Sequence, residues 1–269
     1  MTRNKLSSHA VHPYIVLSVL TLSLFAMVMD PLVLIALSVL FATLIITTQI
    51  GILEKSLKKH QDNLFRQSEC RSILESRLNL EHPLPTTRGY RGSPDFLLQV
   101  YEQIFELRPK VVVEASSGLS TIVCAAAIKN SGCGGRVYSM EHEHEYASGT
   151  RELLERYGLN RIADVFHTPL TEHKIKSSSF RWYDFAQANL PNEIDLIIVD
   201  GPPKHTQKHA RYPAAPLLIE RLNKGGAILV DDTDRKSDSE TINMWQKDFP
   251  FLNVSRLPME KGMTILRNT

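Results

Sequence analysis

The stretch Val111-Val-Val-Glu-Ala-Ser-Ser-Gly-Leu-Ser-Thr121 decides the fold of this chain. Three consecutive β-branched residues are typical of a strand that is buried on both faces. An acid, Glu114, and a run of small residues follow, and the apolar segment 122–128 then predicts a helix. A strand, a tight turn of small residues and a helix N-terminus let a backbone approach a nucleotide-like ligand closely. Taken alone, the stretch predicts either a cofactor loop or an ordinary crossover between strand and helix.

Predicted strands and helices alternate through the rest of the chain. After the strand at 111–115, apolar β-type segments occur at 136–140, 162–166, 194–199, 227–230, 253–257 and 263–266. Helices are expected between them, including one at 214–222 that stops at Gly225. The alternation predicts an α/β, Rossmann-like, doubly wound fold with a mostly parallel sheet of seven strands. Only a short link joins the last two strands, so the last strand must be antiparallel. The polar segment 171–191 stays unassigned.

Acidic side chains follow four of the predicted strands. They are Glu114, Glu141, Asp200 and the pair Asp231-Asp232. In an open parallel sheet, ligands bind outside the carboxyl ends of the strands. Acids at four successive strand ends are therefore more than solvated loop residues, and they predict a functional site at this edge of the sheet.

The N-terminal segment 1–51 predicts a membrane hairpin of two transmembrane helices. Residues 6–29 and 31–53 contain no Lys, Arg, Asp or Glu, and each run is long enough to cross a bilayer. Asp30 between them can cap a helix that Pro31 begins. Basic residues flank the pair on both outer sides, which predicts a multi-pass membrane protein with both ends in the cytoplasm. A cleaved signal peptide would explain only the first run, and a buried helical pair of a soluble domain is the other alternative.

A charged, amphipathic stalk helix is predicted at 52–81, and it ends before two closely spaced prolines. Leu57, Leu64 and Leu78 share a seven-residue spacing that Arg71 interrupts. Such a broken heptad predicts a homo-oligomer through the stalk, with a solvated spacer as the alternative.

The charge and the cysteine content limit the kind of partner and the cellular compartment expected for the remaining domain, 82–269. The formal net charge of the chain is +2, which gives no reason to expect a nucleic-acid partner. The three cysteines have no ligand-like spacing, and we expect no disulfide framework, which suits a reducing compartment.

Within 82–269 the chain resembles a class I S-adenosylmethionine-dependent methyltransferase, of the small-molecule O-methyltransferase branch with an Asp-Gly-Pro-Pro motif. The matching segments are 114–121, 139–142, 194–203, 210–214 and 230–235. The family also has an antiparallel last strand. Its first turn usually reads acid-x-Gly-x-Gly, whereas this chain has Ser116 at the first glycine. A positive φ there would cost on the order of 1 kcal/mol, so the departure bears on cofactor affinity.

The resemblance implies which residues would bind S-adenosylmethionine. Glu114 and the turn that follows it would hold the methionine end, Glu141 the ribose hydroxyls, and the two histidines the adenosine. The implied cofactor-binding set is Glu114, Ser116, Ser117, Gly118, Ser120, Glu141, His142 and His167. The run Glu141-His-Glu-His-Glu145 could also hold a metal, but a strand ends there, which favours the adenosine role for His142.

Asp200 is the expected catalytic residue, because a carboxylate beside the sulfonium methyl can take a proton from the acceptor. His205 is a second candidate base. Asp200, Asp231 and Asp232 resemble the Mg²⁺ site of catechol-type O-methyltransferases, and oxygen ligands suit this ion. The alternative for the last two is a capping acid and an exposed one.

The sequence therefore predicts a membrane-tethered S-adenosylmethionine-dependent methyltransferase with a cytoplasmic catalytic domain. The expected acceptor is a hydroxyl of a small molecule, a sugar or a membrane-associated metabolite. One alternative is a non-catalytic membrane scaffold that retains the fold, which the Ser116 substitution would suit. The other is an NAD(P)-dependent oxidoreductase, against which the missing glycines of the first turn argue.

Overall fold

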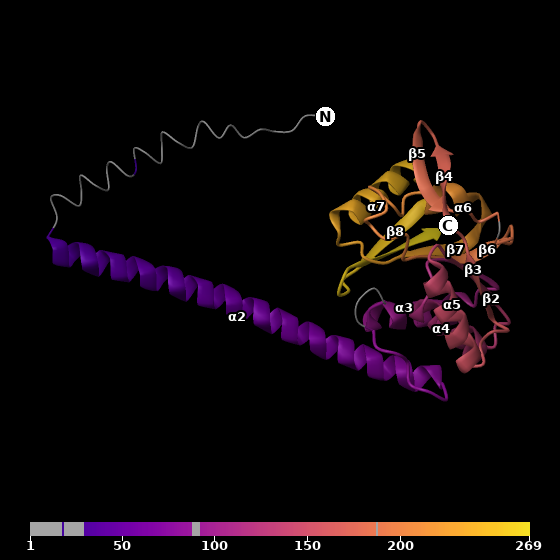
Figure 1. Cartoon of the computed structure of the whole chain (residues 1–269), viewed down its shortest axis with the longest axis horizontal. Coiled ribbons are helices and arrows are strands. Elements are labelled where there is room, and N and C mark those ends of the chain that lie inside the picture. Colours follow the sequence, from indigo (N-terminus) through magenta and orange to yellow (C-terminus); the bar gives the residue numbers. More distant parts are fainter. Residues whose placement is uncertain (1–17, 19–29, 88–91, 187) are drawn as a thin grey trace. The chain divides into compact units, whose positions relative to one another are not determined.

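The computed structural model describes residues 18, 30–87, 92–186 and 188–269 (Figure 1). The chain divides into two compact units, one up to Asp62 and one from Asn63 to Thr269. Apart from Ser18, the first predicted membrane helix, 6–29, lies outside the described residues.

Helix α2, Pro31–Leu78, joins the second predicted membrane run and most of the predicted stalk in one continuous helix. The backbone N–H of Leu32 donates to Asp30 Oδ1 at 2.8 Å, which confirms the predicted cap. Large apolar side chains between Leu32 and Leu57 are exposed. By length and composition, α2 can cross a membrane.

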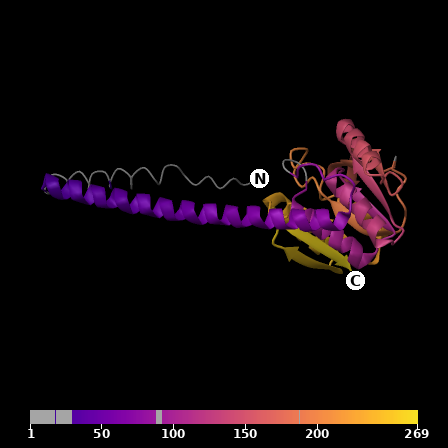
Figure 2. The ribbon, with the colours of Figure 1, turned by 90° about the horizontal axis from the view of Figure 1, so that it is seen from below.

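The unit from Asn63 contains a seven-stranded sheet in the order β3-β2-β1-β6-β7-β9-β8. All its neighbours pair in parallel except the last strand, β9, which is antiparallel to β7 and β8. The predicted Rossmann-like sheet with an antiparallel last strand is therefore confirmed. β8 and β9, drawn in yellow, form one edge (Figure 2). The strands are β1 Val111–Ala115, β2 Arg136–Glu141, β3 Ala163–His167, β6 Ile194–Val199, β7 Leu222–Val230, β8 Leu252–Leu257 and β9 Met263–Asn268.

Helices cover both faces of the sheet, as in a doubly wound fold. One core lies between the sheet and α3 (Pro94–Leu107), α4 (Leu119–Ser131) and α5 (His144–Arg156). The other lies beneath α6 (Ala214–Leu218) and α7 (Lys236–Asp248). Adjacent residues of β1, such as Val112 and Val113, enter opposite cores because side chains alternate along a strand.

The end of α2 belongs to the first of these cores. Leu74 and Leu78 are fully buried there. The sequence placed the stalk, through residue 81, outside the globular domain, whereas the helix is part of the compact unit from Asn63 onward.

The segment that the sequence left unassigned forms a separate two-stranded hairpin, β4 (Leu170–Ile175) and β5 (Ser178–Tyr183), which projects from the large sheet (Figure 1). Its outer part is largely exposed and polar, which hid the strand pattern, but Trp182 and Tyr183 at its base are fully buried.

The helix expected at 214–222 was predicted too long. α6 ends at Leu218, a 3₁₀ turn, η1, covers Ile219–Arg221, and β7 already begins at Leu222. Gly225 and Gly226 lie inside this strand, where the register with β6 is irregular, and a side chain at Gly226 would collide with backbone. Gly226 therefore allows close approach of backbone, and Gly225 supplies a positive φ of 80°, so neither ends a helix.

The three cysteines are free in the structure. Cys124 and Cys133 are buried and Cys70 is partly exposed.

Candidate active site

The order of the strands reverses between β1 and β6, and the candidate site lies at the carboxyl ends of these strands. β1 pairs with β2 on one side and with β6 on the other. This is the topological switch point at which open α/β sheets bind ligands. Glu114 is the last residue but one of β1, Glu141 ends β2, and Asp200 directly follows β6.

Ser116 has a φ of 110°, in the region that favours glycine. A Cβ in this conformation costs on the order of 1 kcal/mol. Two hydrogen bonds hold the turn: the Ser116 N–H donates to the carbonyl of Met140 at 2.9 Å, and the Ser139 hydroxyl donates to the Ser116 carbonyl at 2.7 Å. The turn therefore keeps the backbone that a glycine would adopt.

Glu114 is fully buried, and only one of its carboxyl oxygens has a partner. Oε2 accepts a hydrogen bond from the Thr121 hydroxyl at 2.6 Å and lies 2.8 Å from the hydroxyl oxygen of Ser139. Oε1 has no hydrogen-bond partner among the described residues. Burial raises the pKa of Glu114 to about 7, although the hydroxyls of Ser120, Thr121 and Ser139 act in the opposite direction. An unpartnered buried carboxyl oxygen is costly unless a ligand meets it.

Glu141 ties the end of β2 to the first turn. Its Oε2 accepts the N–H of Ser117 at 3.0 Å, and its Oε1 accepts the N–H groups of His142 and Glu143. Burial raises the pKa of Glu141, but the hydrogen bonds from His142 and from these backbone groups outweigh it and lower the pKa. The carboxyl group is therefore ionised at neutral pH.

The other predicted cofactor residues lie around the same turn. The His167 ring nitrogen Nε2 is 3.2 Å from the carbonyl of His142, which joins the ends of β3 and β2. Gly118 begins α4 with a φ of 151°, and a Cβ placed there would meet no atom within 4 Å. The turn is thus open for a ligand beside Gly118, while Ser120 is buried behind Glu114.

Tyr183 reaches from the base of β5 into the middle of this site. Its side chain is fully buried, and its hydroxyl has no hydrogen-bond partner in the described parts of the chain. A Cβ added at Gly201 would collide with this hydroxyl and would lie 3.1 Å from Ser116 Cβ. Burial, followed by the charges of Glu141 and Asp200, raises the pKa of Tyr183, so the phenol stays protonated.

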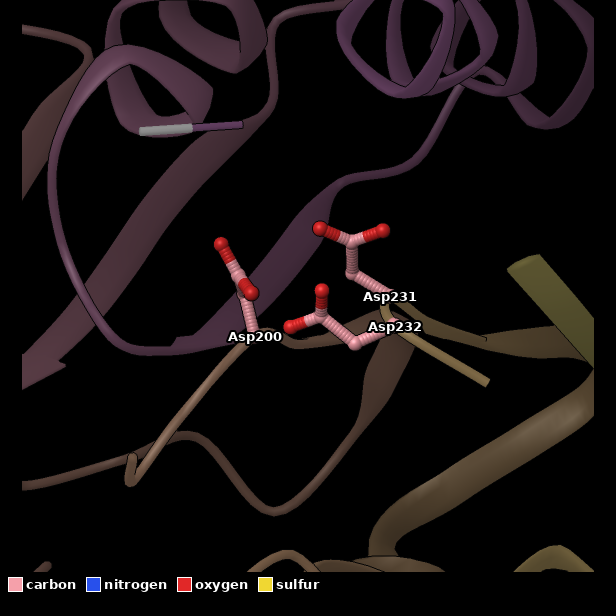
Figure 3. Close-up of side chains that lie close together, drawn as sticks. All are labelled: Asp200, Asp231 and Asp232. Carbon is pink, nitrogen blue, oxygen red and sulfur yellow. The ribbon is translucent and has the colours of Figure 1, made fainter. Parts of the chain in front are cut away.

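Asp200, Asp231 and Asp232 come together at the ends of β6 and β7 (Figure 3). One oxygen from each lies within 4.8 Å of the others. Burial raises the pKa of Asp200, and Asp232 adds to this while Arg211 opposes it. The pKa of Asp231 is raised by burial and by both neighbouring acids. Asp200 and Asp231 therefore retain a proton at higher pH than exposed carboxyl groups do.

Arg211 lies among these acids and is 3% exposed. Its Nη2 is 3.0 Å from Asp200 Oδ1 and 2.7 Å from Asp232 Oδ2. Burial lowers the pKa of Arg211, but the acids outweigh it and keep the guanidinium charged. Because a cation already bridges two of the three proposed ligands, the residues present do not fit the expected Mg²⁺ ion.

One buried acid of the site was missed at the sequence level. Asp238, in the first turn of α7, is buried, with its Oδ1 3.9 Å from Arg211 Nε. An acid in a first helical turn is common, so the sequence held no signal for it. His205, the second candidate base, lies exposed in the turn after β6.

Known proteins share the fold of this unit. Residues 114–233 match the family model described as a methyltransferase domain. Three solved structures are similar at low identity. The SAH-bound methyltransferase PaMTH1 of Podospora anserina is 16% identical, covers 75% of this chain and 86% of its own, and has a TM-score of 0.51. An O-methyltransferase from Bacillus cereus, in complex with SAH, is 16% identical over 75% and 90%, with a TM-score of 0.50.

The third is the O-methyltransferase TomG from Streptomyces achromogenes, which is involved in tomaymycin synthesis and was solved in complex with SAM. It is 15% identical, covers 77% of this chain and 95% of its own, and has a TM-score of 0.50. Identities this low establish the fold. The chain therefore matches a methyltransferase domain over residues 114–233 and shares the fold of these solved methyltransferases.

Proposed function

We propose that this chain is a membrane-anchored methyltransferase that uses S-adenosylmethionine to methylate a hydroxyl group of a small-molecule or membrane-associated acceptor. The observation that carries the proposal is the unpartnered Oε1 of Glu114 at the switch point of the sheet. A buried carboxyl oxygen beside an open turn suits an ammonium group, such as that of the methionine end of the cofactor.

The residues at the ends of β1 and β2 fit the rest of the cofactor. The open space at Gly118 allows a ligand to approach the backbone N–H groups of the turn. Glu141 would accept the ribose hydroxyls in place of the Ser117 hydroxyl, whose contact is long at 3.4 Å. The unpartnered Tyr183 hydroxyl lies between the two halves of the site and can complete a hydrogen bond to the same ligand.

When bound, S-adenosylmethionine supplies a methyl group on a positively charged sulfur. The task left to the chain is to orient the acceptor and to accept its proton as the new oxygen–carbon bond forms. Asp200 is the proposed base, because its carboxyl group is 15% exposed at the edge and its raised pKa makes it a better proton acceptor. His205 is exposed in the following turn and is the second candidate.

The test uses the full-length chain in detergent. Calorimetric titration should show binding of S-adenosylmethionine and none of NADH, which separates the proposal from an oxidoreductase. Glu114→Gln should weaken binding by about tenfold or more, because one charge-assisted hydrogen bond is lost. Glu152→Gln, at an exposed position of α5, is the matched control and should bind normally.

Turnover separates catalysis from binding. With an acceptor found by screening hydroxylated metabolites, Asp200→Asn should reduce kcat by about 10²–10⁴-fold with the cofactor Kd unchanged. His205→Ala should have the smaller effect. If the histidine variant loses more activity than the aspartate variant, the two roles are exchanged.

A non-catalytic scaffold is the second candidate, and two observations favour it. Ser116 strains the first turn, and Tyr183 is fully buried within the site. Neither cofactor nor NADH would then bind to the folded chain, and Asp200→Asn would change nothing measurable.

The membrane anchor and the cytoplasmic side are also part of the proposal. Helix α2 supports an anchor through its exposed apolar segment. A cytoplasmic domain would meet S-adenosylmethionine where it is made, and tethering favours a lipid-linked or membrane-proximal acceptor. Labelling of cysteines introduced at both ends of the chain tests the side: modification of both from the cytoplasm supports the hairpin.

A further inference from the structure

The cluster of Asp200, Asp231 and Asp232 has the composition of a divalent cation site, but Arg211 lies within it (Figure 3 shows the three acids). Arg211 precedes α6, and its guanidinium reaches back to the ends of β6 and β7. Besides the two carboxylates, it donates to the main-chain carbonyls of Asp200, at 2.7 Å, and Asp231. A single side chain thus links both strand ends.

Two oxygens of the cluster are already hydrogen-bonded, whereas Asp232 Oδ1 has no hydrogen-bond partner among the described residues and lies 4.0 Å from Lys261 Nζ. Asp200 Oδ1 accepts a hydrogen bond from Arg211. Asp232 Oδ2 lies 2.7 Å from a guanidinium nitrogen of Arg211 and 2.7 Å from one of Arg235. Mg²⁺ and Ca²⁺ need such oxygens at about 2.0–2.6 Å. An ion at that distance from both would lie against the guanidinium, with like charges in contact in a buried site.

The guanidinium also supplies what a metal would otherwise supply to these acids. It is a permanent positive charge that neutralises buried carboxylates and fixes their direction. One nitrogen, Nη2, contacts a carboxylate oxygen of both Asp200 and Asp232, as an ion between them would. The side chain is 4% exposed, so the guanidinium is held inside the cluster and not in solvent.

We propose that Arg211 takes the place of a divalent cation at this edge of the sheet, so that the reaction of this chain is independent of divalent metals. In this arrangement Arg211 is a positioning residue: it holds the carboxyl group of Asp200 at the strand end, and Asp200 itself meets the acceptor. The part that concerns the reaction rests on the proposed function, whereas the exclusion of the metal does not.

The experiment measures binding of Mn²⁺ by electron paramagnetic resonance to the full-length chain in detergent, with calorimetry of S-adenosylmethionine on the same preparation. The wild type should leave Mn²⁺ free. Arg211→Met removes the charge at similar length and should raise Mn²⁺ affinity by about tenfold or more, as three carboxylates then lack their internal cation. Arg211→Lys keeps a charge and should still exclude the ion.

Arg235→Met is the matched control. Arg235 also contacts Asp232 Oδ2 at 2.7 Å, but it is 38% exposed and lies outside the cluster. Its loss should leave Mn²⁺ unbound. Equal gains in both methionine variants would mean that net charge alone, and not the place of Arg211, excludes the metal, and would overturn the proposal.

Stoichiometric Mn²⁺ binding to the wild type that is lost in Asp231→Asn would also overturn it. This arm needs no Arg211 variant, so it decides the question even if Arg211→Met does not fold.

If the wild type binds S-adenosylmethionine and its turnover resists chelators, both proposals stand. If it requires Mg²⁺ for turnover, only the metal-free inference fails. If it excludes Mn²⁺ and does not bind S-adenosylmethionine, the proposed function fails and the assignment of Arg211 holds.

Discussion

At the scale of single residues, Glu114 makes the stability of the domain depend on pH. Its pKa is about 7 in the folded chain, compared with an ordinary value of 4.5. The unfolded chain therefore loses this proton at lower pH than the folded chain, and the free energy of unfolding falls as the pH rises from 4.5 to 7. A stabilisation on the order of 3 kcal/mol is fully present below this window and lost above it.

Glu114→Gln should remove that dependence. We expect the variant to be more stable than the wild type at pH 8 by an amount that shrinks at pH 5, because glutamine stays neutral at both. Urea unfolding of the full chain, followed by the fluorescence of the buried Trp182 and Trp245, measures the difference. The control Glu152→Gln should follow the wild type, and an equal gain at both pH values would refute the assignment.

Ser116→Gly should stabilise the domain, since it relieves the positive φ of 110°. The expected gain is about 1 kcal/mol, or roughly 2–4 °C in Tm for a unit of this size. Ser116→Ala keeps the Cβ and should show no gain, so the pair separates backbone strain from the loss of the hydroxyl. Calorimetric scans provide the comparison. A stabilising Ser116→Ala would place the cost in the hydroxyl instead.

The sequence predicted which residues end the strands, but it could not predict how charge is shared among them. Glu114, Asp200 and Asp231 follow apolar runs that are readable without a structure. The position of Arg211 depends on a turn and on packing against α7, and these are long-range effects. The sign of φ at Ser116 likewise depends on hydrogen bonds from the neighbouring strand.

At the scale of elements, the β4–β5 hairpin was the part of the fold that the sequence did not reveal. The large sheet was predictable because its strands are apolar runs of the expected length. The hairpin pairs only with itself, so exposed polar residues occupy most of its length. Its contribution to the site, Tyr183, comes from the last residue of β5.

Tyr183→Phe should leave the domain as stable as the wild type or more stable, because the hydroxyl that it removes is buried without a partner. The same change should raise the Kd for S-adenosylmethionine by about tenfold, since the proposed hydrogen bond to the ligand is lost. Tyr212→Phe is the matched variant. It removes a hydroxyl that donates to Asp248 Oδ2 at 2.7 Å, and it should cost about 1 kcal/mol.

Thermal unfolding and calorimetric titration of the two variants measure both effects. A destabilised Tyr183→Phe with normal binding would show that the hydroxyl has a structural partner instead.

The structure of helix α2 limits which part of the stalk can form the contact of the proposed homo-oligomer. Of the heptad positions, Leu78 is buried in the core of its own chain, and Arg71 donates to the carbonyls of Leu84 and Pro85. Leu57 is 58% exposed. Leu64 is 38% exposed, so self-pairing through the stalk has to involve the part of α2 before Arg71, and it stays a prediction.

At the scale of the whole molecule, the proposed membrane anchor rests on the apolar half of α2. We expect the wild type to stay with membranes in alkaline carbonate, which strips peripheral proteins. Leu40→Arg combined with Leu44→Arg places two charges on one exposed face of the uncharged run and should lower the retained fraction, at about 2.5–3.5 kcal/mol per charge. Leu57→Arg lies beyond that run and should be retained normally. Release of the wild type by carbonate would refute the anchor.

The pairing of β1 with β6 also has a consequence for how the chain folds during its synthesis on the ribosome. Val112 pairs with Leu196, so β1 has to wait for β6, a pairing partner that is translated much later. At about 5–20 residues per second, this wait lasts roughly 4–17 seconds. During it, the edge of β1 that β6 will cover is open, while α2 has already emerged. Nascent chains released in this interval are the ones most exposed to aggregation and most dependent on chaperones.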